Sequence, residues 1–595
     1  MAKKFLEGVD LKAQNSRNGF DVSYQNQFTM PFGMILPHFF QRVNPDDKLK
    51  LSNETQVICD GLVRPAFMRL KLHLDYYFIP STQLWMPFDN FVTGQNSYFS
   101  TLAKDKNEGN VPTEVPTFTL NFLQNLFTSW NTDSLKDDLG FDFRQGATRL
   151  LDLLGYVNLT GVANHNFAYM DELGWTDNTT RFNFLPLLCY QKVYYDYFRN
   201  TKYEDNLTSA YNIDDLANGA VIDDLGTLST RANEFFKIHY RWQKRDYFTQ
   251  TQPNVLVDST QIGYSGMGAG ASTANLFNIP GYTSPSAAVI TNYPSATPQN
   301  NGNFVRTGGV SGSNATQAAN IASGVQANGV SVANIRFAFA YDKLLRRMRE
   351  AGADFDAQML AQFGIKPFDM RHGKCTYIGG YTNSLNSKDI TNMTGDEIGE
   401  LAGQINTYCD NSKKVLRFHA KEHGYVIGVI STSVENMYQS YRSSRETLLR
   451  NRFDWFNPAF ENLGLQPIFA AERDYTGTLQ DSQEGGRTNI FDTNSYRNII
   501  GYVPRYSELK THPDECHGNL CQYSDIVGYK EWNVQVNTEW GTNQVMDKST
   551  MLLNPHQFDD VSGIPFDGLQ TSDHFVVNSF NHSRKVSSMS VYETF

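Results

Sequence analysis

The residues best spaced for chemistry are His419, Glu422 and His423, which form an H-x-x-E-H pattern. On a helix, two histidines four residues apart share a face and can bind zinc, with the glutamate as general base. The flanking sequence predicts a strand instead, because Gly424 follows at once and residues 425–430 are mostly apolar. Residues four apart on a strand are separated by about 13 Å, too far to share one zinc ion. We therefore do not expect a metalloprotease.

Two further patterns resemble binding motifs but lack the required context. Residues 266–271 fit G-x-G-x-x-A, yet no apolar strand precedes them and no helix pattern follows, so dinucleotide binding is not expected. A small cluster contains His512, Cys516, His517 and Cys521, but the adjacent Cys516 and His517 fit one tetrahedral zinc site poorly. The sequence predicts no catalytic residues, no metal site and no cofactor.

The strongest binding signal is basic. Residues 241–248 read Arg-Trp-Gln-Lys-Arg-Asp-Tyr-Phe, which interleaves cations with aromatic side chains. This composition suits single-stranded nucleic acid, through phosphate pairing and base stacking. A structural segment whose cations pair with carboxylates would have the same composition. A second candidate is the helix stripe Arg346, Arg347 and Arg349, for which a solvated helix face is the alternative. The candidate DNA-facing residues are Lys3, Lys4, Arg241, Lys244, Arg245, Arg346 and Arg347.

The composition limits the class of protein. The chain has 595 residues, a net charge of −11, 19% charged residues and 13% aromatic residues, which argues against disorder, coiled coil and collagen. No apolar run is long enough for a membrane helix, and the N-terminus does not resemble a secretory signal. Six cysteines are too sparse for a disulfide scaffold, so we expect reduced thiols. Any nucleic-acid contact must be a local patch in an acidic protein.

Hydrophobic periodicity predicts a mainly β protein with some helix. Apolar and polar residues alternate over residues 68–79, between Pro65 and Pro80, and the polar face begins with basic residues. Short strands separated by Gly, Pro and Asn turns recur beyond residue 375, which suggests a β-sandwich. Helices are expected near residues 119–127, 147–154, 187–199 (where a strand is the alternative), 337–348 and 354–363.

One long segment differs from the rest of the chain. Residues 259–334 contain a single charged residue, Arg306, among Gly, Ser, Ala, Thr, Asn and Gln. A loop this long inside a domain is usually functional, although a solvated linker is the alternative. The candidate exposed attachment residues in it are Tyr264, Phe277, Tyr282, Tyr293, Phe304 and Arg306.

Seven short segments, taken in order along the chain, resemble the major capsid protein of the Microviridae. The Microviridae are small icosahedral single-stranded DNA phages. The sequence most resembles the capsid protein of their gokushovirus-type branch. The segments are residues 69–80, 185–199, 245–249 (Arg-Asp-Tyr-Phe-Thr), 335–365, 377–380 (Tyr-Ile-Gly-Gly), 422–428 (Glu-His-Gly-Tyr-Val-Ile-Gly) and 501–508.

The resemblance implies an eight-stranded antiparallel jelly-roll β-sandwich with large loop insertions. It also implies a T=1 shell of about sixty copies around circular single-stranded DNA. Further implied partners are a host-cell receptor and a small basic DNA-binding or minor virion protein. The low-charge segment would build protrusions at the three-fold axes. The chain would be a virion component assembled in the bacterial cytoplasm, without membrane insertion and without enzyme activity.

The expected organisation combines these observations. We expect an N-terminal arm and first turns (1–60), core strands (61–90 and 376–595), a long insertion with helices (91–258), the low-charge surface insertion (259–334) and a helical segment (335–375). An alternative function is a carbohydrate-binding or glycan-cleaving β-sandwich. Cleavage would need two carboxylates across a cleft, and no spacing of acids singles out such a pair.

Overall fold

The structure is a computed structural model. It describes residues 17–62, 69–94, 112–130, 136–156, 180–216, 219–223, 231–253, 340–341, 343–344, 347–348, 355–365, 373–391, 401–436, 444–450, 452, 454–461, 465–469, 472, 499–515, 548–562 and 572–589. The chain divides into two compact units. The larger comprises Met1–Pro253 with Lys366–Phe595, and the smaller comprises Asn254–Ile365.

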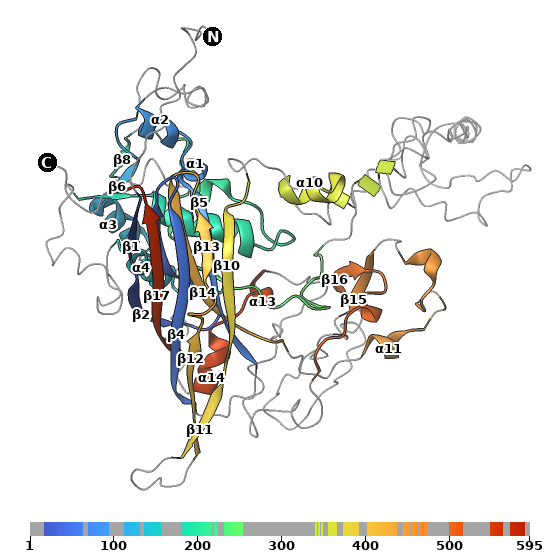
Figure 1. The fold of residues 1–595 in the computed structure, drawn as a ribbon. Helices are drawn as coiled ribbons and strands as arrows, with labels where there is room; N and C mark the ends of the chain where they lie inside the picture. The colour runs from blue at the N-terminus through green and yellow to red at the C-terminus, as the bar shows by residue number, and fades with distance from the viewer. Residues whose placement is uncertain are drawn as a thin grey trace, which may run out of the picture. The chain divides into compact units, whose positions relative to one another are not determined.

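The larger unit is built on two antiparallel sheets. The first sheet contains, in spatial order, β1 (Asn18–Asp21), β17 (Phe575–Ser587), β4 (Lys48–Leu62), β12 (Leu401–Asp410) and β11 (Ser387–Thr391), with β2 (Tyr24–Met30) also paired to β17 and β13 (Leu416–His419) also paired to β4. The second contains β10 (Thr376–Leu385), β5 (Leu70–Pro80), β14 (Gly424–Val434), β3 (Met34–Val43) and β9 (His239–Tyr240). Figure 1 shows β17 beside β4, strands from opposite ends of the chain.

The two sheets share one hydrophobic core. Along β17 buried and more exposed residues alternate, so one face of the first sheet packs inward. The strand β14 is buried along nearly its whole length, and helix α6 (Leu185–Val193) packs against it. A polar contact also crosses between the sheets: Tyr76 of β5 donates to Asn581 of β17, which also accepts from Asn53 of the neighbouring β4. The described part of the chain is therefore a mainly β sandwich, which confirms the predicted class.

Helices lie mainly in the insertion between β5 and β10. They are α1 (Ser81–Leu84), α2 (Phe88–Thr93), α3 (Leu120–Ser129), α4 (Phe143–Leu153), α6, the π-helix η3 (Tyr194–Phe198), η4 (Thr208–Ala210) and α7 (Ala232–Phe236). The predicted helices near 119–127 and 147–154 are confirmed by α3 and α4. The segment 187–199 is helical, not a strand, and most of its side chains are buried because it lies between β14 and other insertion elements. A small sheet, β7 (Arg181–Asn183), β6 (Thr117–Thr119) and β8 (Val221–Ile222), completes this insertion.

The strand predicted over 68–79 is confirmed by β5, whose burial alternates from Leu70 to Asp75. The strand predicted over 425–430 lies within β14. The second helix predicted to end at Phe363 is α10 (Phe355–Phe363), and Gly364 follows it with φ +70°. Remaining elements are β15 (Leu465–Phe469) paired with β16 (Ile499–Pro504), and the short helices α11 (Arg445–Leu448), η8 (Pro458–Phe460), η10 (Ser507–Leu509), α13 (Lys548–Met551) and α14 (His556–Ser562).

The structure differs from the expected N-terminal arm. Residues 18–62 form β1 to β4, and these strands belong to the two sheets. The prolines that suggested turns fit the strands: Pro31 and Pro45 lie between strands, and Pro37 lies beside the register shift opposite Gly428 and Val429. A proline is tolerated at such places, because it has no N–H to donate to the ladder.

Two further findings concern the cysteines and the helices. Within the described ranges Cys59, Cys189, Cys375 and Cys409 are buried. Among the same residues no helix is long and apolar enough to cross a membrane.

Candidate nucleic-acid interface

A cavity of about 500 Å³ opens where the segment after β9 passes the ends of β5 and β14. Five cationic side chains and one carboxylate belong to its lining. The cations are Lys71, Arg199, Arg241, Lys244 and Arg245, and the carboxylate is Glu435. The three basic residues that the sequence placed in one patch therefore border one hollow, which we call the basic cavity.

Arg241 is held rigidly in the wall of the basic cavity. Its backbone N–H donates to the Gly33 carbonyl (2.8 Å), and its own carbonyl accepts from Leu553 N (2.9 Å). Its guanidinium donates to Ser431 Oγ (2.8 Å) and lies 5.7 Å from the centre of the Phe198 ring. Burial lowers the pKa of Arg241, against the opposing effect of Asp75. Arg241 is thus a partly buried charge with fixed orientation.

Lys244 and Arg245 project further. Both are exposed, and the Lys244 side chain is 58% exposed. The backbone beneath them is fixed, because Asn436 donates to the Lys244 carbonyl (3.0 Å) and Asp246 Oδ1 accepts from the N–H groups of Phe248 and Thr249. These two cations can reach a phosphate without moving the main chain.

Glu435 is the acidic centre of the basic cavity. Its carboxylate accepts from Lys71 Nζ (2.7 Å) and Arg69 Nη1 (3.1 Å) and lies 3.6 Å from Lys244 Nζ. The hydrogen bond from Lys71, with that from Arg69 and the Lys244 charge, lowers the pKa of Glu435 to about 2. Burial, with Arg241 and Lys71 nearby, lowers the pKa of His73 to about 3, so this histidine is neutral at physiological pH. The cavity therefore stays positive, with one carboxylate against five cations.

The aromatic residues of the predicted patch divide into two groups. Trp242 lines the basic cavity together with Tyr197 and Phe198. Tyr247 and Phe248 are 3% and 1% exposed and pack in a second apolar cluster, with Tyr247 donating to Glu472 (3.0 Å). The interpretation that these two rings stack on bases is therefore wrong: the Asp246 turn directs them into the protein.

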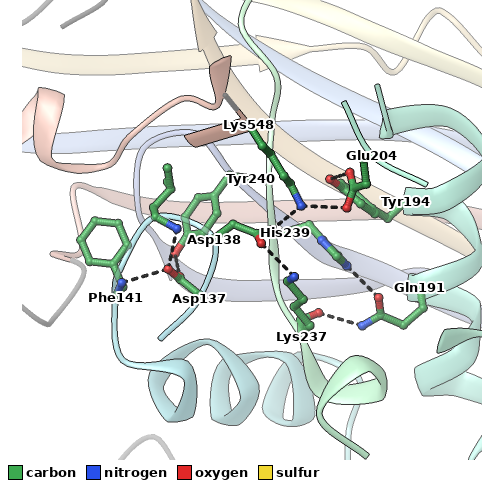
Figure 2. Close-up of polar contacts among 11 residues, drawn as sticks. Asp137, Asp138, Phe141, Gln191, Tyr194, Glu204, Lys237, His239, Tyr240 and Lys548 are labelled. Carbon is green, nitrogen blue, oxygen red and sulfur yellow. Dashed lines mark hydrogen bonds and ion pairs between the residues drawn. The ribbon is translucent and has the colours of Figure 1, made fainter. Parts of the chain in front are cut away.

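A polar network includes residues of η3 and β9, the elements that precede several of the cavity residues (Figure 2). Asp138 binds Lys237 (2.9 Å) and Lys548 (2.7 Å), and Lys548 also binds Glu204 (2.7 Å). Tyr194 of η3 donates to the same Glu204 (2.7 Å). This hydrogen bond links η3, which contains Phe198 and is followed by Arg199, to the network.

Two further contacts extend this network to β9. His239 bonds Gln191 (2.8 Å) and stacks on Tyr194, with ring centres 3.5 Å apart. Tyr240 donates to Asp137 (2.6 Å). Because the network fixes η3 and β9, it also fixes the cavity residues that follow each of them.

The sequence overlooked several cavity residues. Lys71 and Glu435 come from β5 and the end of β14, and Arg199 follows η3. The basic start of the polar face of β5 was a signal for Lys71. Nothing local marks Glu435, because only strand pairing brings it beside Lys71.

Other candidate residues do not join this site in the described structure. Arg347 is exposed in the smaller unit. Lys3, Lys4, Arg346 and the attachment residues Tyr264, Phe277, Tyr282, Tyr293, Phe304 and Arg306 lie outside the described residues. His419 ends β13 and His423 precedes β14, so the H-x-x-E-H pattern is not on a helix, and His419 binds Asp46 (2.7 Å). Within the described ranges no group of three His, Cys, Asp or Glu residues could hold a metal ion.

Comparison with known proteins identifies the family. The family model described as "Capsid protein (F protein)" matches residues 10–143 and 158–560. The second range includes the low-charge segment. This chain belongs to the phage capsid protein F family. The predicted resemblance is thereby confirmed, and the protein is a structural component of a phage virion.

Relatives with this name cover most of the chain. Capsid protein VP1 of Chlamydia phage 1 is 20% identical over 548 residues, 84% of both chains. Capsid protein VP1 of Bdellovibrio phage phiMH2K is 22% identical over 544 residues, 85% of this chain and 82% of the relative. Capsid protein VP1 of Spiroplasma virus 4 is 23% identical over 197 residues, about a third of each chain.

Proposed function

We propose that this capsid protein encloses a circular single-stranded DNA genome in a T=1 shell of about sixty copies. The match to a capsid family along most of the chain is the observation that carries the proposal. It favours a structural role without catalysis over the glycan-binding or glycan-cleaving alternative. Assembly would take place in the bacterial cytoplasm.

The strand order supports a jelly-roll core for this shell. If the two-residue β9 is left out, β1 is counted with β2 as one strand, and β11, β12 and β13 are counted as another, eight strands divide equally between the two sheets. Consecutive strands then change sheet at every step except from β5 to β10. Such alternation is expected of two interlocked Greek keys, the jelly-roll arrangement common in viral capsids.

The basic cavity is the proposed site of genome contact. Lys244 and Arg245 would bind phosphates, and Trp242 and Tyr197 offer rings beside them on which a base can stack. Residues 259–334 would face outward for host attachment. A small basic virion protein is a further expected partner inside the shell.

Charge reversal tests the genome contact. Particles carrying Lys244→Glu and Arg245→Glu should retain less nuclease-protected DNA than wild-type particles, because two phosphate contacts become repulsive. The control reverses two exposed cations of the β15–β16 region, Arg450→Glu and Lys510→Glu, and should package normally. Normal packaging by the cavity variant would contradict the proposed site, whereas wild-type chains that form no DNA-containing shell would contradict the proposed function itself.

A further inference from the structure

Like charges lie in register across the exposed face of the first sheet. Arg584 of β17 is directly opposite Lys50 of β4, and Lys50 is directly opposite Arg417 of β13. All three side chains are exposed. Strands in a sheet are about 4.8 Å apart, and like charges directly opposite each other destabilise the pair. The fold therefore tolerates a repulsive arrangement at this end of the sheet.

A fourth cation extends the arrangement. Lys48 is two residues before Lys50 on the same exposed face, opposite His419. We call Lys48, Lys50, Arg417 and Arg584 the cationic row. Its position on the first sheet, and its residues, are separate from the basic cavity.

The carboxylates near the cationic row leave most of its charge uncompensated. Asp21 is opposite Arg584 on β1, and Asp46 is engaged by His419 (2.7 Å) and by Arg17. On the inward face Lys585 and Asp47 form a buried ion pair (2.6 Å), so their charges neutralise each other. In the part of the chain that the structure describes, no ion pair within 4 Å involves any residue of the cationic row.

The surface over the cationic row is hollow. A cavity of about 630 Å³ is lined by all four cations and by residues of β1, β4, β13 and β17. Phe20, Leu49 and Phe418 alternate with the cations along their strands and also belong to the lining. The lining therefore combines the four cations with a larger share of apolar surface.

We propose that the cationic row is a second contact surface for the phosphate backbone of single-stranded DNA, lying across the strands of the first sheet. A flexible chain with one negative charge per nucleotide can neutralise cations on neighbouring strands in turn. The centre of a protein–protein interface is depleted of charged residues, whereas four cations without an ion-pair partner among the described residues line this hollow. Because contacts to phosphate groups carry no sequence information, we expect binding that does not depend on base sequence. This inference rests on the proposed function.

The salt dependence of DNA binding tests the cationic row. The probe is a fluorescent oligothymidylate bound to the purified full-length chain, with affinity measured by anisotropy over a range of salt concentrations. The variant is Lys50→Gln/Arg417→Gln/Arg584→Gln. Because each phosphate contact to a single strand contributes about 0.7 to the slope of log affinity against log salt, the variant should lose about 2 units of slope. Its affinity at low salt should fall at least tenfold.

A matched control separates a local effect from the loss of net charge. The control variant Arg450→Gln/Arg452→Gln/Lys510→Gln removes one lysine and two arginines, all exposed, from the β15–β16 region. It should retain the wild-type slope. A second readout needs no DNA: removal of opposed like charges should leave the thermal unfolding midpoint of the row variant equal to or above that of wild type.

Three outcomes would overturn the inference. They are a row variant with the slope of the control, a row variant that unfolds at markedly lower temperature, and normal DNA binding combined with failed particle assembly. The last outcome would make the row an interface between copies. A failure of the proposed function would be seen separately, as wild-type protein that forms no DNA-containing shell.

Discussion

At the scale of single residues, Glu435 sets how much positive charge the basic cavity presents. Among the described residues it is the only carboxylate in the lining, and it engages Arg69, Lys71 and Lys244. The substitution Glu435→Gln frees these cations, so oligothymidylate should bind more tightly and with a steeper salt dependence. Anisotropy titrations measure both, and Glu461→Gln, at an exposed ion pair with Lys510, is the control. Weaker binding by Glu435→Gln would show that the carboxylate orients the cations instead of competing for them.

His38 makes a separate prediction about pH. Its side chain is 1% exposed, and burial lowers its pKa from 6.5 to about 3. Between these values the unfolded chain binds a proton that the folded chain does not, so stability falls as pH falls below about 6.5. From pH 7 to pH 5 the loss from this group is about 2 kcal/mol.

The His38→Gln variant measures that contribution. Its urea unfolding midpoint should depend less on pH between 7 and 5 than the wild-type midpoint does. The exposed His419→Gln is the control. An unchanged pH dependence in His38→Gln would mean that His38 takes up a proton in the folded state.

Residue types predicted the candidate site only in part. Arg241, Lys244 and Arg245 were identified as a patch from local composition, because clustered cationic side chains are recognisable in the sequence. Tyr247 and Phe248 were assigned to the wrong side, because the turn made by Asp246 decides where they point. Glu435 could not be found, since its proximity to Lys71 depends on the pairing of β14 with β5.

At the scale of elements, β14 lies so close to its neighbours that it cannot accommodate a larger side chain at Gly428. A Cβ added at Gly428 would lie 2.8 Å from His38 Nε2 and 2.9 Å from both Phe39 Cβ and Tyr76 Cε1. The substitution Gly428→Ala should therefore reduce the free energy of unfolding by about 1–3 kcal/mol. Gly19→Ala on β1, where nothing lies within 4 Å of the new Cβ, should change it by less than about 0.5 kcal/mol. Chemical unfolding followed by circular dichroism distinguishes them, and equal stabilities would refute the tight packing of β14.

Elements with a clear period were predictable, and those decided by tertiary context were not. The alternation in β5 has one buried and one partly exposed face, so the sequence alone reveals the strand. The segment 18–62 looked like turns, because prolines interrupt it where the sheets bend or end. Its strands pair with strands far along the chain, such as β17. A local sequence pattern cannot predict such pairing.

At the scale of the whole molecule, the low-charge segment should be separable from the sandwich. Residues 254–365 form a unit distinct from the rest of the chain. Deletion of residues 259–334 should leave the larger unit folded, with a thermal midpoint within a few degrees of wild type, while infection or attachment falls. Unchanged infection would contradict the attachment role, and loss of folded protein would contradict the separation of the units.

The mass of the assembled particle tests the central claim most directly. Closed symmetry with about sixty copies of a 67.4 kDa chain predicts a protein shell of about 4 MDa, plus the mass of its DNA. Charge-detection mass spectrometry of purified particles, before and after DNA is released, separates the two contributions. A discrete shell near 4 MDa that loses mass with its DNA is the predicted result. Monomers, open fibres of variable mass, or closed shells that hold no DNA would contradict the account.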